Sequence, residues 1–236
     1  LKPSVKIDKK KEELLLNFSQ KISGNAELFI DFEGELTDKL AGFYRSKYHV
    51  DGKEKYLATT MFEATDARRA FPCFDNPEQK ATFDITLIVD RNLQTISNMP
   101  VTEEKEIGKN KTSVKFEKTP IMSTYLLYMC VGEFEFLEDK LDNILVRVVT
   151  TPGKIEQGKL AIGFTKKFLK FYQDYFKIKY PLPKLDLIAL PDFASGAMEN
   201  WGAITFREVA LLYDPKTSSV ATKQRIAEVV SHEIAH

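Results

Sequence analysis

The chain has 236 residues, of which 43% are hydrophobic and 29% are charged, a composition typical of folded globular proteins. Its 34 basic and 34 acidic side chains cancel, so charge gives no reason to expect nucleic acid or an anionic membrane as a partner. No apolar stretch reaches the ~18 residues that a transmembrane helix needs. The two cysteines, Cys73 and Cys130, lie far apart in the sequence, which argues against a disulfide framework and favours a cytoplasmic location.

Residues 1–150 have the pattern of a strand-rich domain. The segment 81–89 alternates most clearly, with apolar side chains at every second position from Phe83 to Val89. Turn-forming pairs such as Asp51-Gly52 separate the apolar runs. The predicted strands cover 12–18, 26–32, 56–62, 81–89, 112–118, 124–131 and 144–149. Their spacing predicts an antiparallel sheet or sandwich.

The pattern changes at Thr151-Pro152-Gly153, where we place a boundary that leaves 151–236 as the start of a second, α+β domain. A helical period over 154–176 predicts an amphipathic helix whose aromatic face packs in the core. The residues expected on that face are Leu160, Phe164, Phe168, Phe171, Tyr172 and Tyr175. Buried strands are predicted over 185–190 and 203–206, and a second helix over 221–236.

The last five residues form an H-E-x-x-H motif, made by His232, Glu233 and His236. Residues four apart on a helix lie one turn above each other on the same face, so both imidazoles can bind one metal ion. Glu233 lies beside them and can contact a water molecule. Ile226 and Val230 fall on a different face, so the helix can pack while presenting its histidines. The alternative is an amphipathic helix with two surface histidines.

A catalytic zinc site needs a third protein ligand. The remaining histidine, His49, precedes the predicted Asp51-Gly52 turn and is expected in a hairpin. Because the chain begins with Leu1 and ends within the motif, we expect it to be a piece of a longer protein in which the third ligand follows His236. The piece alone is then expected to bind zinc weakly and to be inactive.

A second cluster, Gly196-Ala197-Met198-Glu199-Asn200, lies between the two strands predicted in the second domain. Small residues allow a substrate backbone to approach closely, and a sheet edge at this place can pair with an extended peptide. Glu199 can neutralise a cationic group such as a free α-amine. The plain alternative is an irregular surface loop with a solvated glutamate.

The pentapeptide 196–200 and the H-E-x-x-H about 30 residues later are far more specific together than either alone. With these two motifs the sequence resembles the gluzincin zinc aminopeptidases, the family that includes aminopeptidase N, puromycin-sensitive aminopeptidase and the archaeal tricorn-interacting factors. The stretches 63–75 (EATDARRAFPCFD) and 122–128 (MSTYLLY) agree with it. The resemblance implies a β-rich, saddle-shaped amino-terminal domain over 1–150, lacking its first strands, followed by the first part of a thermolysin-like catalytic domain over 151–236.

The resemblance also implies a role for each motif residue. His232 and His236 would bind one Zn²⁺ ion, and Glu233 would be the general base that activates water for attack on the peptide carbonyl. Glu199 would bind the free α-amine of a peptide substrate, which makes the enzyme an exopeptidase. Glu63 would line the pocket for the first side chain. The other residues implied in substrate binding are Gly196, Ala197, Met198 and Asn200.

One position departs from the family pattern. Met61 stands where the family usually has Gln, and Met cannot supply the hydrogen bonds of an amide. We therefore expect amine recognition to depend on Glu199 and the first pocket to be more apolar. The alternatives are a thermolysin-type zinc endopeptidase, which lacks an amine anchor, and a non-catalytic scaffold. The intact H-E-x-x-H argues against the scaffold, which has no use for a base beside two ligands.

Overall fold

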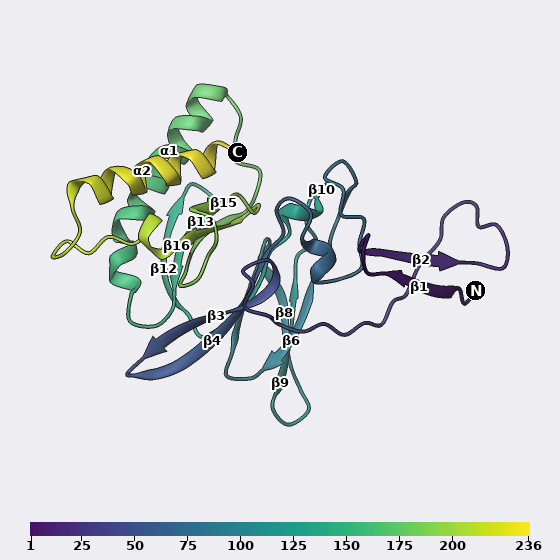
Figure 1. Ribbon diagram of the computed structural model, residues 1–236. Helices are drawn as coiled ribbons and strands as arrows, with labels where there is room; N and C mark the ends of the chain where they lie inside the picture. The colour runs from purple at the N-terminus through teal and green to yellow at the C-terminus, as the bar shows by residue number, and fades with distance from the viewer.

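The computed structural model describes residues 1–236 as a strand-rich amino-terminal part followed by a mixed part in which two helices cover a sheet (Figure 1). The amino-terminal strands are β1 (Ser4–Asp8), β2 (Glu13–Asn17), β3 (Gly42–Val50), β4 (Lys53–Met61), β5 (Lys80–Ala81), β6 (Thr86–Asp90), β7 (Gln94–Ser97), β8 (Val101–Ile107), β9 (Lys111–Phe116), β10 (Met122–Ser123) and β11 (Met129–Gly132). They form four small sheets, with strand orders β1-β2, β10-β5, β3-β4-β11-β7 and β6-β9-β8. All pairings in these sheets are antiparallel, as the sequence predicts.

The β3–β4 hairpin shows how local sequence fixes a turn. Asp51 and Gly52 both have positive φ, 50° and 73°, which two-residue hairpin turns of the I′ type require. His49 pairs with Glu54 in this hairpin, which confirms its predicted place. The hairpin is tied to the second part of the chain because the Tyr44 hydroxyl donates to the Asp192 carbonyl at 3.0 Å.

The second part is built on a five-stranded sheet with the order β12-β13-β14-β16-β15. Its strands are β12 (Glu135–Leu141), β13 (Ile144–Thr150), β14 (Lys184–Leu190), β15 (Ala197–Met198) and β16 (Ala203–Arg207). The three central strands are parallel, and both edge strands are antiparallel to their neighbours. Every residue of β14 is buried, as predicted for 185–190, and this includes the charged side chains of Lys184 and Asp186.

Two helices, α1 (Lys159–Phe176) and α2 (Val220–Ala235), lie side by side over this sheet (Figure 1). A core of 17 buried residues joins the helices to the sheet. A second core of 19 buried residues runs from Tyr44 and Phe62 in the amino-terminal part to Ile188 and Met198 in the sheet, so the two parts share one packed interior. Four short 3-10 helices complete the fold, η1 (Ala67–Arg69), η2 (Thr124–Leu126), η3 (Ile155–Gly158) and η4 (Glu208–Ala210). No helix has both the length and the hydropathy that a membrane crossing requires.

Several predicted elements differ from the structure. Residues 26–32 form no strand, and Phe29 is 89% exposed, because no other segment pairs with this run. The predicted strand 124–131 begins as the 3-10 helix η2. Residues 82–85 are also not in a strand, although the predicted alternation of exposure over 81–89 is confirmed. The predicted boundary after residue 150 separates β13 from β14, which pair in one sheet.

The predicted aromatic face of α1 is confirmed only in its first half. The fully buried residues are smaller than expected, with Ala161 and Thr165 facing the sheet. Phe171 and Tyr175, in the last two turns, are 56% and 69% exposed. They stack on each other, with ring centroids 5.7 Å apart, because these turns extend past the sheet.

Candidate active site

Helix α2 presents the H-E-x-x-H motif as predicted. The helix begins after Ser219, whose hydroxyl accepts a hydrogen bond from the Thr222 backbone N–H at 3.1 Å. Ile226 and Val230 are completely buried on its inner face. His232 and His236 are exposed at its last turn, so packing and ligand presentation are divided between two faces.

The two imidazoles aim at one point. Their Nε2 atoms are 3.2 Å apart, and two ligands about 2.05 Å from one tetrahedral ion lie ~3.3 Å apart. The spacing of the two nitrogens is therefore compatible with two ligands of one zinc ion. No cluster of three or more His, Cys, Asp or Glu side chains is arranged to hold a metal, and His232 and His236 form a pair of candidate ligands.

Glu233 is a buried carboxylate without a partner. The residue is 8% exposed, and its Oε2 atom forms no hydrogen bond. Burial, and then the charges of Glu199 and Glu63, raise the pKa of Glu233 to about 7. A carboxylate in this state accepts a proton readily near neutral pH, as a general base must.

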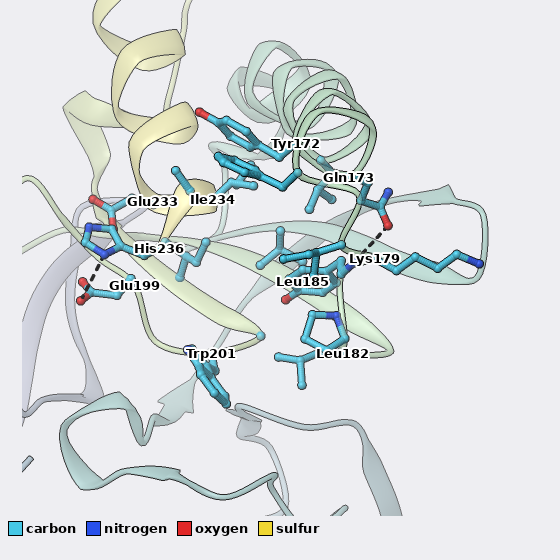
Figure 2. A pocket seen from close by; sticks show the side chains of 18 of the residues that line it. Tyr172, Gln173, Lys179, Leu182, Leu185, Glu199, Trp201, Glu233, Ile234 and His236 are labelled. Atoms are coloured by element: carbon cyan, nitrogen blue, oxygen red, sulfur yellow. Dashed lines mark hydrogen bonds and ion pairs between the residues drawn. The ribbon is translucent and has the colours of Figure 1, made fainter. Parts of the chain in front are cut away.

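Glu199 follows the edge strand β15 and lies beside the histidines. Its Oε1 atom is 3.9 Å from Nδ1 of His236, and its side chain is 15% exposed (Figure 2). It makes no other ion pair. Glu199, Glu233 and Glu63 therefore form a group of carboxylates with no Lys or Arg paired to any of them, which is an arrangement that favours a cationic ligand.

The residues around Glu199 fall into two groups. Gly196 is exposed, and its carbonyl accepts from the Arg207 N–H at 2.9 Å, while Ala197 and Met198 pair with β16 and leave the other side of β15 without a neighbour. The side chains of Met198 and Asn200 are buried, the first in the core and the second 3.4 Å from the Thr205 hydroxyl. Only their backbone atoms remain for contact with a peptide.

The amino-terminal part contributes to the same site. Glu63 follows β4 and lies close enough to raise the pKa of Glu233. Tyr125, in η2, was not singled out as a site residue from the sequence. Burial, and then the charges of Glu199 and Glu63, raise its pKa, so Tyr125 belongs to the same electrostatic environment as both carboxylates. The stretch 122–128 resembles the family, and this was the one sequence signal that pointed to Tyr125.

An apolar cavity of about 420 Å³ opens beside the site. Figure 2 shows Glu199, Glu233 and His236 grouped at one end of it, and Tyr172, Leu182 and Leu185 among its walls. The cavity lies between the ends of α1 and α2 and the turn that follows Glu199. Glu199, Glu233 and His236 thus border a largely apolar space.

The turn after Glu199 depends on Gly202. Its φ is +71°, and a Cβ atom there would lie 2.3 Å from the Asn98 carbonyl oxygen. Gly202→Ala is expected to lower the free energy of unfolding by at least ~2 kcal/mol. Gly153→Ala is the matched control, because Gly153 has φ +90° with no atom within 4 Å and is expected to cost ~1 kcal/mol. Urea unfolding measures both, and equal losses would show that the contact with Asn98 is unimportant.

Comparisons with known proteins find relatives that match most of the chain. The model of the peptidase M1 N-terminal domain matches residues 2–126, and that of the peptidase family M1 domain matches residues 160–236. Aminopeptidase M1 of Arabidopsis thaliana is 50% identical over 236 residues, which cover 99% of this chain and 27% of the relative. Puromycin-sensitive aminopeptidase of Caenorhabditis elegans is 51% identical over 89% of this chain and 22% of its own length. Aminopeptidase N of Canis lupus familiaris is 47% identical over 95% and 24%. The chain spans about a quarter of the length of these curated relatives.

Proposed function

The chain belongs to the peptidase M1 family, and we propose that the whole protein is a zinc-dependent aminopeptidase that removes the first residue from peptides. One observation supports this most strongly. Three carboxylates, Glu63, Glu199 and Glu233, surround a histidine pair without any basic partner of their own. Such a site lacks compensating positive charge, and a divalent metal ion together with a substrate α-amine would supply it.

His232 and His236 would hold the metal, with a third ligand from the sequence that follows residue 236 in the whole protein. A zinc ion bound there supplies a Lewis acid that polarises the scissile carbonyl and acidifies water. Glu233 takes the proton from the attacking water and then passes it to the leaving amine. Residues 1–236 alone, with two ligands, are expected to bind zinc weakly and to show no turnover.

Glu199 would bind the free α-amine, and this contact limits cleavage to the first peptide bond. The open side of β15 would pair with the substrate backbone through Gly196 and Ala197. Glu63 would border the pocket for the first side chain. Met61, two residues before Glu63, is 7% exposed and packs in the core, and a more apolar first pocket would favour Leu or Met at the substrate amino terminus.

We also propose the finer features of the fold. The saddle shape of the amino-terminal domain and the thermolysin-like character of the catalytic domain remain proposals, as does the division into 1–150 and 151–236. The sheet that joins β13 to β14 argues for placing 135–150 with the catalytic part. The cytoplasmic location inferred from the cysteines is a proposal as well; both thiols are free.

Substitution of Glu199 tests the function directly. In the whole enzyme, Glu199→Ala is expected to raise KM for leucyl amide by ~10- to 100-fold, because an ion-paired hydrogen bond to the substrate is lost. The wild-type enzyme is expected to leave N-acetyl-leucyl amide uncleaved. Kinetics on both substrates, with zinc content measured in parallel, make the test. Equal cleavage of the blocked and free substrates by the wild type would replace the proposal with an endopeptidase, and absence of bound metal would leave a scaffold.

A further inference from the structure

The turn that follows Glu199 rests on a buried polar junction between the two parts of the chain. Asn98, just after β7, is 1% exposed. Its Nδ2 donates to the carbonyl oxygens of Leu126 and Trp201, both at 2.8 Å, and its Oδ1 accepts from the Tyr128 N–H at 2.8 Å. The Asn98 side chain thus bonds to the segment at and just after η2 and to the turn that follows Glu199.

Lys184 completes the junction from the opposite side. It is 2% exposed, at the start of β14. Its Nζ donates to the Gly202 carbonyl at 2.7 Å, to the Ser97 carbonyl at 2.9 Å and to the Asp186 carboxylate at 2.7 Å. Asn98 and Lys184 therefore bind two consecutive carbonyls of the turn, those of Trp201 and Gly202.

This junction connects two segments that lie far apart in the sequence. Asn98 holds the Leu126 carbonyl at the end of η2 and the Trp201 carbonyl in the turn. Lys184 holds the next carbonyl of that turn, Gly202. The turn that carries Glu199 is thus tied both to the amino-terminal part and to the start of β14.

Stability alone does not explain why Asn98 and Lys184 are buried here. Burying a lysine has a large desolvation cost, and a well-packed apolar side chain is often as stable or more stable at such a position. Asn98 and Lys184 instead fix the position of the turn, because their hydrogen bonds form only when the Trp201 and Gly202 carbonyls are in place. Displacements of about 1 Å in a substrate-binding group are enough to weaken recognition substantially.

We propose that Asn98 and Lys184 are positioning residues that hold the β15–β16 turn, so that Glu199 meets the α-amine of the substrate. This inference rests on the proposed aminopeptidase function. Neither residue touches the histidine pair, so their loss acts on binding of the amine and leaves the metal in place.

The test is to replace each residue in the whole enzyme. Asn98→Ala and Lys184→Met are each expected to raise KM for leucyl amide by ~10-fold, with kcat changed by less than ~3-fold and zinc content unchanged. The inhibition constant of free leucine should rise by the same factor, whereas that of N-acetyl-leucine should not change. Asn98→Ser, which removes less volume than Asn98→Ala and supplies a hydroxyl as a hydrogen-bonding group, provides a second variant if Asn98→Ala does not fold.

Thr59→Val is the matched control. Thr59 is completely buried in the same core, and its hydroxyl is 2.9 Å from the Tyr128 hydroxyl, but it contacts neither carbonyl of the turn. The control is expected to lower the unfolding temperature without changing KM. If it raises KM as much as Asn98→Ala does, the effect is one of stability and the inference is wrong.

A double variant separates this inference from the function on which it rests. On the Glu199→Ala background, Asn98→Ala should raise KM by less than ~2-fold, because the group that it positions is gone. A full additional effect would overturn the positioning role and leave the aminopeptidase proposal intact. Free-amine preference that survives Glu199→Ala would overturn the role of Glu199 as the amine anchor, whereas equal cleavage of blocked and free substrates by the wild type would overturn the proposed function.

Discussion

Glu233→Gln is expected to lower kcat of the whole enzyme by ~10²- to 10⁴-fold, because Gln keeps the shape of the side chain and cannot accept a proton. KM and zinc content should change little, since His232 and His236 remain. The variant also removes a buried charge that has no partner. The metal-free protein is therefore expected to unfold at the same or a higher temperature, so the loss of turnover cannot be attributed to misfolding.

Glu228→Gln is the control on the same helix. Glu228 is 69% exposed and is paired with Arg225 at 3.0 Å on the outer face of α2. It is expected to retain wild-type kcat and to change stability by less than ~1 kcal/mol. Loss of activity in Glu228→Gln, or a near-wild-type kcat in Glu233→Gln, would show that Glu233 is not the general base.

The largest loss of stability is expected from Asp186→Ala, at ~3–5 kcal/mol. Asp186 is completely buried in β14, where it binds Arg147 through two hydrogen bonds of 2.7 and 2.8 Å and Lys184 through one of 2.7 Å. Its removal leaves two cations in the interior without an anion. Urea unfolding of the wild type and the variant gives the difference in unfolding free energy.

The Asp186 carboxylate also determines how the stability of the protein should change with pH. Burial by itself would raise the pKa of Asp186, but Lys184 and Arg147 outweigh this effect and lower the pKa below its ordinary value. The stabilisation is therefore present at neutral pH and is lost as the pH falls toward the lowered pKa. Glu138→Ala is the control for the ion pairs, because Glu138 contacts the same Arg147 at 3.9 Å while 55% exposed. It should cost less than ~1 kcal/mol, and a loss similar to that of Asp186→Ala would contradict the assignment.

The parts of the fold that sequence could predict are those governed by local pattern. Four-residue spacing placed His232 and His236 on one face of a helix, and a mostly apolar run over 185–190 predicted the buried strand β14. Small residues between two strands located β15 and Glu199. In each case the chemistry is carried by neighbours in the sequence, so periodicity and turn propensity were sufficient.

The parts that could not be predicted depend on contacts between distant segments. Residues 124–126 are 3-10 rather than strand because the Leu126 carbonyl is held by Asn98. The aromatic residues Phe171 and Tyr175 follow the helical period of α1, but the sheet ends before it reaches them. No local sequence pattern marks Tyr125, Asn98 or Lys184, since their roles depend on contacts between distant segments.

The pairing of β13 with β14 has a consequence for producing the two parts of the chain as separate polypeptides. A break after residue 150, where the composition changes, would leave the hydrogen-bonding edge of β13 open in one product and that of β14 open in the other. Exposed edges of this kind recruit strands from other molecules, so each separate half would tend to aggregate. Co-expressed halves would instead be drawn together again, because each supplies the strand that the other lacks.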